Sequence, residues 1–403
     1  MNFGYFLYKI KDVKWRDILS VFPMMLGICG IPFAKRNYSD TWLIGEADNE
    51  ARDNGYHFFK YLREKHPEQK AVYFISPNAI DASKVIKYGP IVKQGSIKHW
   101  TMYFTCPWII SSQKGGKPNA ALCAFIELKG WFRPHFVFLQ HGVTKDRNSW
   151  LMADKCVFDY VITATRSEYE FMKSSFGYRE GVVQLTGFPR FDNLHDVKVN
   201  KKRIVIMPTW RTWLCNNSSK GVTGESDFKH SQFVLKWLEL LNSDELAGLA
   251  KENNLEIFFY PHRQLQSRLD QFCITNPYIR VVRSSELDIQ EALRTSALMI
   301  TDWSSVYFDM FYMKKPVILY QFDEEEFRAH HYENGWFDYH NNPFSLSINS
   351  CKDVIDKLRE YIDNDFSVSE KFIEGHHYEF ELYDSHNSER VYQLIHNQVD
   401  YER

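Results

Sequence analysis

Four residues whose side chains handle protons or phosphates stand where apolar runs of the chain end. They are His141, Arg211 and the adjacent His262 and Arg263. A neutral imidazole accepts a proton from a hydroxyl near pH 7, and a guanidinium binds two phosphate oxygens at once. The pattern therefore predicts a site that holds a nucleotide diphosphate and activates a hydroxyl. His141 and His262 are the candidate catalytic residues, and the arginines are candidate phosphate ligands.

Two serines add a second kind of phosphate ligand. Leu298 to Thr301 predicts a buried strand, and after a turn a helix is expected to open on Ser304 and Ser305 and to hold Lys314 and Lys315 in its last turn. Free backbone N–H groups and the positive end of the helix dipole converge at such a start, which suits a phosphate. The alternative is that the serines only cap the helix.

Neighbouring residues complete the candidate set. Lys145 follows His141 closely, Thr209 precedes Arg211, and Thr301 ends the strand before the serines; all three are candidate substrate ligands. Gly142 allows a tight turn or a close approach to a ligand. Structural interpretations remain open, with His141 as a hydrogen-bonding residue and Arg211 as a surface side chain beside a packed tryptophan.

The elements that must position these residues form two successive sets of short apolar runs. Because the runs are apolar throughout and alternate with amphipathic stretches, they predict parallel strands covered on both faces. We therefore predict an α/β fold of two doubly wound, Rossmann-like domains facing a central cleft. The predicted strands are 71–76, 108–112, 136–140, 160–164 and 182–186, then 203–207, 255–260, 279–282, 298–301 and 317–320.

A polar stretch at 192–203 precedes the second set and marks the predicted domain boundary. The predicted domains are an acceptor-side domain at 41–198 and a donor-binding domain at 199–403. The stretch from 215 to 227, rich in Gly and Ser, is a candidate mobile lid or acceptor loop. Predicted helices include 167–176, 227–241 and 288–296, the last with Asp288 as its N-cap.

The N-terminal 40 residues contain the one long apolar run, Ile18 to Ala34, flanked by Lys and Arg on both sides. The run is shorter than the roughly 20 residues that a spanning helix needs, and Pro and Gly interrupt it. We interpret residues 1–40 as a membrane-associating segment that lies in the interface. A buried helical hairpin is the alternative.

Composition narrows the class of protein. The 403 residues carry a net charge of −2, which gives no support to a nucleic-acid partner. The seven cysteines are scattered and form no C-x-x-C pair, which argues against a disulfide framework or a zinc site and favours a reducing compartment. Dinucleotide-binding, P-loop and nucleophile-elbow motifs are absent from the sequence.

Six motifs in order resemble the CDP-glycerol glycerophosphotransferase family, the teichoic-acid and capsule polymerase group. They are LQHGVTKD (139–146), TGFPRFD (186–192), MPTWR (207–211), YPHR (260–263), TDWSSVYFDMFYMKKPVILYQFD (301–323) and YDSHNSERV (383–391). Residues 45–62 resemble the family's opening strand and helix. The resemblance covers the chain from about residue 40 to its end.

The resemblance implies a GT-B-like architecture and transfer of glycerol phosphate or ribitol phosphate from a CDP-alditol, without cofactor or metal. The implied acceptor is a hydroxyl of a teichoic-acid-like or capsular polymer, or of a lipid-linked primer. The protein would act peripherally at the cytoplasmic face of the cell membrane. His141 matches the family's proposed base; Arg211, His262, Arg263, Ser304 and Ser305 match positions around the donor pyrophosphate.

Two departures from the family bear on the acceptor and the alditol. The chain has His141-Gly142-Val143-Thr144 where teichoic-acid members carry His-Gly-Thr-Pro, and Ser385 precedes His386 where many relatives have Asp-Gly. A nucleotide-sugar glycosyltransferase of the GT-B type could use the same cleft. A membrane scaffold is a third possibility, although it would not need phosphate ligands and a base in one place.

Overall fold

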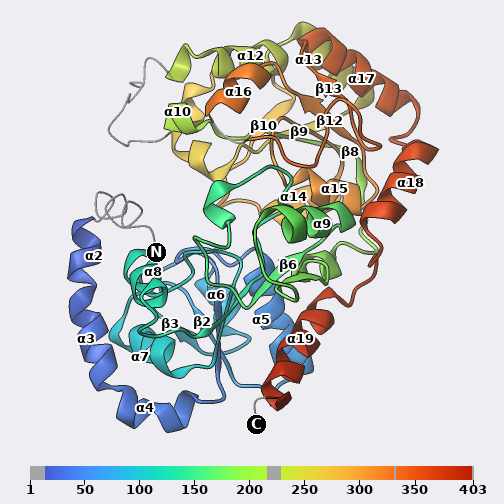
Figure 1. Ribbon diagram of the computed structural model, residues 1–403. Helices are drawn as coiled ribbons and strands as arrows, with labels where there is room; N and C mark the ends of the chain where they lie inside the picture. The colour runs from blue at the N-terminus through green and yellow to red at the C-terminus, as the bar shows by residue number, and fades with distance from the viewer. Residues whose placement is uncertain (1–13, 216–227, 331–332, 402–403) are drawn as a thin grey trace.

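The computed structural model describes residues 14–215, 228–330 and 333–401, which form two parallel β-sheets with helices packed around them (Figure 1). The first sheet has the strand order β3-β2-β1-β4-β5-β6-β7, and the second has the order β10-β9-β8-β11-β12-β13. In each sheet the chain starts at an inner strand, winds outward to one edge and then crosses to the other side. The predicted pair of doubly wound domains is therefore confirmed.

The first sheet is built from strands that the sequence shows as short apolar runs. β1, β2 and β4 are buried at every residue, which explains why they do not alternate with polar residues. The strands are β1 (Trp42–Gly45), β2 (Ala71–Phe74), β3 (Ile91–Val92), β4 (Trp108–Ser111), β5 (His135–Phe138), β6 (Tyr160–Thr163) and β7 (Val183–Leu185).

Helices on this sheet are capped by side chains as their sequences indicate. Asp53, Ser96, Asn119 and Thr165 each accept a hydrogen bond from a backbone N–H in the first turn of the following helix. The elements are α5 (Asn54–Lys65), α6 (Ala82–Ile86), α7 (Ile97–Thr105), α8 (Ala120–Leu128), η1 (Ser149–Leu151), α9 (Arg166–Ser175) and η2 (Pro189–Asn193).

The second sheet repeats the plan around β8 and β11, its two inner neighbours. Its strands are β8 (Asn200–Met207), β9 (Glu256–Phe259), β10 (Ile279–Val281), β11 (Ser296–Thr301), β12 (Val317–Tyr320) and β13 (Ser347–Ile348). Its helices are α10 (Thr212–Cys215), α12 (Gln232–Leu241), α13 (Asp244–Asn253), η3 (Arg263–Gln271), α14 (Ile289–Thr295), α15 (Tyr307–Tyr312), α16 (Glu324–His330) and α17 (Cys351–Asp363).

The end of the chain returns to the first sheet. α18 (Glu370–Glu379) contacts α9, and α19 (Asn387–Tyr401) packs on α5 and η2 (Figure 1). Asp192 accepts hydrogen bonds from the backbone N–H groups of Asn387 and Ser388 at the start of α19. The motifs at 186–192 and 383–391 are thus joined in space, and the final helix lies on the domain where the chain began.

Three helices precede β1 and lie along the outside of the first domain (Figure 1). They are α2 (Trp15–Leu19), α3 (Val21–Cys29) and α4 (Ile31–Tyr38). α3 packs closely on α7, since a methyl group on Gly27 would lie 2.6 Å from the Cβ of Trp100. Trp15, Phe22 and Phe33 remain 68–84% exposed, so the segment is not the buried hairpin considered above.

No single helix within the described residues is long and apolar enough to cross a membrane. The bent pair Trp15–Cys29 and Ile31–Tyr38 together has the length and composition of a membrane span.

Several sequence expectations differ from the structure in detail. β1, β3 and β13 are absent from the predicted strands. The resemblance placed an opening strand and helix at 45–62, whereas β1 ends at Gly45; β3 and β13 have two residues each, too few to show a periodicity. The predicted helix at 227–241 begins instead at Gln232, after the Ser231 cap. Most of the candidate lid at 215–227 lies outside the described residues. Asp288 caps α14 as expected, with its carboxylate accepting from the N–H of Gln290.

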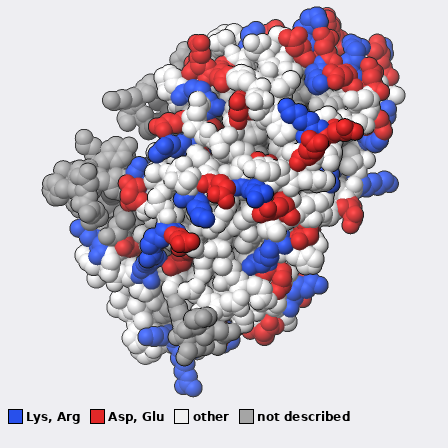
Figure 2. All heavy atoms as spheres, turned by 45° about the vertical axis from the view of Figure 1, so that its right-hand side comes forward, with Lys and Arg blue, Asp and Glu red and all other residues white. Residues whose placement is uncertain are grey.

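Acidic and basic side chains are interspersed on the face shown in Figure 2, with no single continuous basic patch. This distribution agrees with the net charge of −2. A nucleic-acid footprint would require a clustered basic surface.

Candidate active site in the cleft between the two sheets

A cavity of about 550 Å³ opens between the two domains, at the carboxyl ends of the inner strands of both sheets. It receives the loops after β1, β4 and β5 from one side and the loops after β8, β9 and β11 from the other. Ligands of open α/β sheets bind at such points, where the strand order reverses. Seven sequence-predicted residues line the cavity: His141, Lys145, Thr209, His262, Arg263, Ser304 and Ser305.

His141 is held by a carboxylate. Its Nδ1 lies 2.5 Å from Oδ2 of Asp53, while the side chain is 61% exposed towards the cavity. Burial in the cleft opposes protonation, but the charge and hydrogen bond of Asp53 outweigh it and raise the pKa of His141. Nδ1–H therefore donates to Asp53, which leaves Nε2 available to accept a proton from a substrate.

Asp53 is kept ionised by a second partner. Arg190 donates to Asp53 Oδ1 at 3.1 Å, and the same guanidinium forms a two-point contact with Asp309 at 2.8 and 2.9 Å. Burial alone would raise the pKa of Asp53, but His141 and Arg190 lower it. Burial and the Asp53 charge raise the pKa of the neighbouring Glu46 to about 8. Of these two carboxyl groups, Asp53 is therefore the one that ionises at lower pH.

Arg190 also links the two domains. It follows β7 in the first domain, whereas Asp309 lies on α15 in the second. In sequence, the Gly and Pro of the Thr186–Arg190 segment indicate only that it shapes a crossover. The structure shows a further role, because the buried guanidinium connects Asp53, the partner of His141, to Asp309 of the second domain.

Gly142 places His141 against the second domain. The backbone turns at Gln140, whose φ is +58°, and Gly142 then passes so close to Ser305 that an added methyl group would lie 2.6 Å from Ser305 Oγ. The sequence suggested that Gly142 allows the turn or a close ligand. The structure assigns the turn to Gln140 and the close approach to Ser305.

The two serines form a turn and do not begin a helix, which corrects the sequence prediction. α15 begins at Tyr307 and has six residues, while Ser304 Oγ accepts a hydrogen bond from the N–H of Val306 at 3.2 Å. The helix dipole argument is therefore weak here. The hydroxyls still reach the cavity, and phosphate binding at this turn would rest on hydroxyl and backbone donors.

The predicted helix end is also different. The helix stops at Tyr312, so Lys314 and Lys315 lie beyond it, with Lys314 in the left-handed region at φ +56°. Lys315 is buried and donates to the carbonyls of Leu293, Arg294 and Ser296. It serves the packing of α14 and β11.

Arg211 does not reach the cavity, which corrects its expected role as a direct phosphate ligand. Its side chain is 0% exposed and forms ion pairs with Asp323 at 2.7 Å and Asp302 at 2.9 Å. Trp303 donates its indole N–H to the same Asp323 at 3.0 Å. Arg211 Nη1 also donates to the carbonyl of Thr209 at 2.8 Å, so this buried side chain ties together the loops after β8, β11 and β12.

Three other candidate substrate ligands are held by contacts within the protein. Thr301 is fully buried, and its hydroxyl donates to the carbonyl of Met207, so it does not line the cavity. Lys145 is 4% exposed and pairs with Asp146. Thr209 lines the cavity, but its N–H is held by Asp302 at 2.8 Å.

His262 and Arg263 stand at the second domain's edge of the cavity. His262 caps η3 and stacks near Trp210, with ring centroids 6.2 Å apart. Arg263 is 44% exposed and pairs with Glu50 of the first domain at 2.7 Å. The arginine is therefore accessible, and a phosphate that binds it would compete with Glu50.

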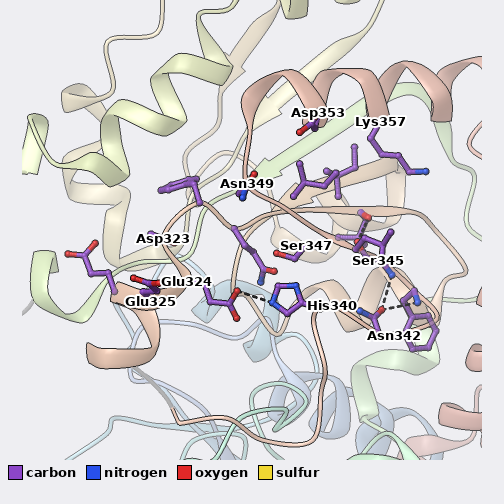
Figure 3. Close-up of a pocket in the computed structure, with 18 of the residues that line it drawn as sticks. Asp323, Glu324, Glu325, His340, Asn342, Ser345, Ser347, Asn349, Asp353 and Lys357 are labelled. Carbon is purple, nitrogen blue, oxygen red and sulfur yellow. Dashed lines mark hydrogen bonds and ion pairs between the residues drawn. The ribbon is translucent and has the colours of Figure 1, made fainter.

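A larger cavity of about 1360 Å³ lies elsewhere in the second domain, beside β12, β13 and α17 (Figure 3). The labelled acidic residues surround it, and a hydrogen bond of 3.0 Å joins Glu324 Oε2 and His340 Nε2. Five carboxylates line it against two lysines and one histidine, namely Asp323, Glu324, Glu325, Glu326 and Asp353 against Lys357, Lys371 and His340. Such a lining disfavours a diphosphate, so the smaller cleft is the better candidate.

Sequence reasoning missed Asp53, Arg190, Asp309 and Glu50. Asp53 stands directly before Asn54 at the start of an amphipathic run, which is a recognisable N-cap signal but gives no hint of a histidine 88 residues away. Among the described residues, no group of three or more His, Cys, Asp or Glu side chains is arranged to hold a metal ion.

Comparison with known proteins gives three results at the sequence level. The family described as CDP-Glycerol:Poly(glycerophosphate) glycerophosphotransferase matches residues 32–397. The minor teichoic acid biosynthesis protein GgaB of Bacillus subtilis is 30% identical over 365 residues, which cover 89% of this chain and 40% of that protein. The ribitol-phosphate polymerase TarL of Staphylococcus aureus is 25% identical over 57% of this chain and 39% of its own length.

This chain thus spans about 40% of the length of the curated relatives that it matches first.

Solved structures match the fold over nearly the whole chain. A histidine-to-asparagine variant of the wall teichoic acid polymerase TagF, soaked with CDPG, has a TM-score of 0.66 at 16% identity and covers 99% of this chain and 98% of that one. A UDP-N-acetylglucosamine 2-epimerase from Listeria monocytogenes has a TM-score of 0.55 at 13% identity, covering 90% and 97%. These likenesses confirm the GT-B-like fold.

Proposed function

Because this chain belongs to the CDP-glycerol:poly(glycerophosphate) glycerophosphotransferase family, we propose that it transfers an alditol phosphate from a CDP-alditol to a hydroxyl of a teichoic-acid-like polymer or its primer. The observation that carries the proposal is the His141–Asp53 pair, 2.5 Å apart, which faces the Ser304–Ser305 turn and the His262–Arg263 edge across one cavity. A base lies on one side of the cleft, and groups that can donate hydrogen bonds to a phosphate lie on the other.

His141 acts as the general base in this proposal. Its Nε2 takes the proton of the acceptor hydroxyl as the oxygen attacks the β-phosphorus of the donor. The bond between that phosphorus and the bridging oxygen breaks, and CMP leaves with the electron pair. Asp53 holds the imidazole in the tautomer that exposes Nε2 and stabilises the imidazolium that forms.

The second domain holds the donor. The diphosphate would lie against the hydroxyls and backbone of Ser304 and Ser305, with Arg263 and His262 at its other side. Phosphoryl transfer needs mainly positioning and stabilisation of charge on the phosphoryl oxygens, which these groups supply. In this role His262 contacts the phosphates, and proton transfer from the acceptor belongs to His141.

Ion pairs across the cleft support a closed reacting state. Arg263 pairs with Glu50 at 2.7 Å, Lys84 with Asp288 at 3.0 Å, and Arg328 with Asp146 at 2.8 Å. Closure limits the access of water, which would otherwise hydrolyse the donor. Donor entry would require at least the exposed Arg263–Glu50 pair to open.

The N-terminal helices would place the enzyme at the cytoplasmic face of the membrane. Trp15, Phe22 and Phe33 on α2, α3 and α4 are 68–84% exposed, and basic residues flank the segment. Aromatic and aliphatic side chains of this kind enter the boundary between headgroups and acyl chains. A peripheral position would bring the cleft close to membrane-bound acceptors.

Incubation of the purified protein with an alditol-phosphate acceptor and each of CDP-glycerol, CDP-ribitol and a UDP-sugar tests the proposal. We expect CMP release with at least one CDP-alditol and a product heavier by one alditol phosphate per transfer. Release of UDP alone would identify a glycosyltransferase instead. The donor that gives the faster CMP release defines the alditol.

A further inference from the structure

A second cavity in the first domain, of about 1090 Å³, lies between α2 and α8. Asp17 of α2 and Asn119 at the start of α8 hold its two walls together through a hydrogen bond of 2.8 Å. We call this cavity the α2–α8 groove. It shares no lining residue with the acidic cavity of the second domain.

The groove combines an apolar lining with positive charge. Apolar surface comes from Ile18 of α2, Val21 of α3, and Leu122 and Phe125 of α8. Seven Lys and Arg side chains line it against three acidic ones, although the whole chain has a net charge of −2. Lys117 and Glu127 form a buried ion pair at 2.6 Å, so their two charges cancel. A cationic excess remains around the apolar surface.

One end of the groove joins the candidate active site. Lys114 and Gly115, in the loop after β4, line both the α2–α8 groove and the His141 cleft. The ammonium of Lys114 is held at this junction by the carbonyls of Trp150, at 2.6 Å, and Lys155, at 3.0 Å. A positively charged group therefore stands where the two cavities meet.

The groove also borders an exposed apolar ridge, by which we mean the exposed side chains of Trp15, Ile18 and Phe22 on α2 and α3. Ile18 lines the groove and is 52% exposed, and Trp15 and Phe22 on the neighbouring turns are 76% and 68% exposed. A chain lying in the groove would thus run from the ridge proposed to face the membrane to the side of the cleft that holds the base.

We propose that the α2–α8 groove binds a lipid-linked anionic acceptor, with its hydrocarbon part along α2 and α8 and its phosphate near Lys114. The inference rests on the proposed function. The apolar lining suits a hydrocarbon chain, and the basic residues suit the phosphate that joins lipid to polymer. A lipid-free polymer would use the charges but not the apolar walls.

Two probes that differ only in the hydrocarbon tail test this occupant. Lysophosphatidylglycerol carries a glycerol phosphate headgroup on one acyl chain, and glycerophosphoglycerol carries the same headgroup without the chain. Binding of each probe would be measured by calorimetry in the absence of donor, with the lipid below its critical micelle concentration. The full chain should bind the tailed probe at least about tenfold more tightly, because each buried methylene adds to affinity.

Ala124→Trp narrows the groove from α8, where Ala124 is half-buried and lines the wall. We expect this variant to lose most of the difference between the two probes. Ala247→Trp is the matched control, since Ala247 is also half-buried on a helix but lies on α13 of the second domain. The control should keep the difference in full, and binding to vesicles of anionic lipid should be equal in the two variants.

Equal binding of the two probes by the unaltered protein, or equal effects of the two tryptophan substitutions, would overturn the groove proposal. These outcomes are independent of turnover, because no donor is present. A protein that binds the tailed probe selectively but releases no CMP from any CDP-alditol would instead overturn the proposed function.

Discussion

Gly142 and Ser305 touch across the cleft: a methyl group on Gly142 would lie 2.6 Å from Ser305 Oγ and 3.4 Å from its Cβ. The residue after the candidate base therefore abuts the turn that is the candidate phosphate site. Residues from two domains, distant in sequence, share one pocket. The proposed chemistry depends on this distance, because a proton acceptor and a phosphate cradle must face the same reacting hydroxyl.

Substitution of Gly142 by alanine should impair transfer by pushing Ser305 away. In the variant Ser305→Ala the oxygen is gone and the remaining contact of 3.4 Å is ordinary. The double variant should therefore lose less than the two single effects combined. A double-mutant cycle on kcat/KM should give a coupling energy of about 0.5–3 kcal/mol. Additive effects would show that the contact is absent in the working enzyme.

The pH dependence of transfer should reflect the His141–Asp53 pair. The base must be neutral, and its pKa is raised above the ordinary 6.5. The rate should therefore rise with pH, with a midpoint above that value. In Asp53→Asn the attraction between the carboxylate and the imidazolium is lost, so the midpoint should move to lower pH while the plateau rate falls.

Rate profiles of CMP release for the two proteins measure this shift. His66 also lies near a carboxylate, 3.3 Å from Glu389 but outside the cleft, so Glu389→Gln is the control and should leave the profile unchanged. A profile that does not move in Asp53→Asn would remove His141 from the role of base.

Arg211 should matter for stability more than for donor affinity. Arg211→Met leaves Asp302 and Asp323 buried without their cation, and breaking a buried pair in this way costs about 3–5 kcal/mol of unfolding free energy. Arg211→Lys should restore part of that loss. Chemical denaturation measures it. A variant of unchanged stability that no longer binds CDP-glycerol would restore the direct phosphate contact expected from sequence.

Arg263 and Glu50 should affect donor binding in opposite directions. Arg263→Ala removes a charged phosphate contact, which is typically worth about 1.5–3 kcal/mol, and should raise the Kd for CDP-glycerol. Glu50→Gln releases Arg263 from its pair of 2.7 Å and should lower the Kd. Calorimetry measures the Kd for CDP-glycerol of both variants. A rise in Kd for Glu50→Gln would mean that the pair helps to form the donor site.

Much of this site could be predicted because its residues follow strands. His141, His262 and the two serines each come directly after a buried apolar run, and parallel strands bring such residues to one edge of a sheet. The alternation of strand and helix predicts two parallel sheets with a cleft between them, whereas the order of the strands comes only from the structure. Local pattern therefore sufficed for the fold and for half of the site.

The rest depends on long-range partners that no local pattern records. Arg211 looks like a phosphate ligand in sequence, and only the fold shows that its guanidinium forms ion pairs with Asp302 and Asp323. Asp53 looks like a helix cap, and its contact with His141 arises only when the loops after β1 and β5 meet. A charged residue's partner determines its role, and that partner is chosen by tertiary structure.

The most direct test of the account is single-turnover CMP release by His141→Gln, measured together with its affinity for CDP-glycerol. Loss of a positioned general base typically slows a reaction by about 10²–10⁴-fold, so we expect a fall of that size while the donor Kd stays unchanged. An unchanged rate of CMP release in the presence of the acceptor, or a loss explained entirely by weaker donor binding, would contradict the central claim that His141 deprotonates the acceptor hydroxyl.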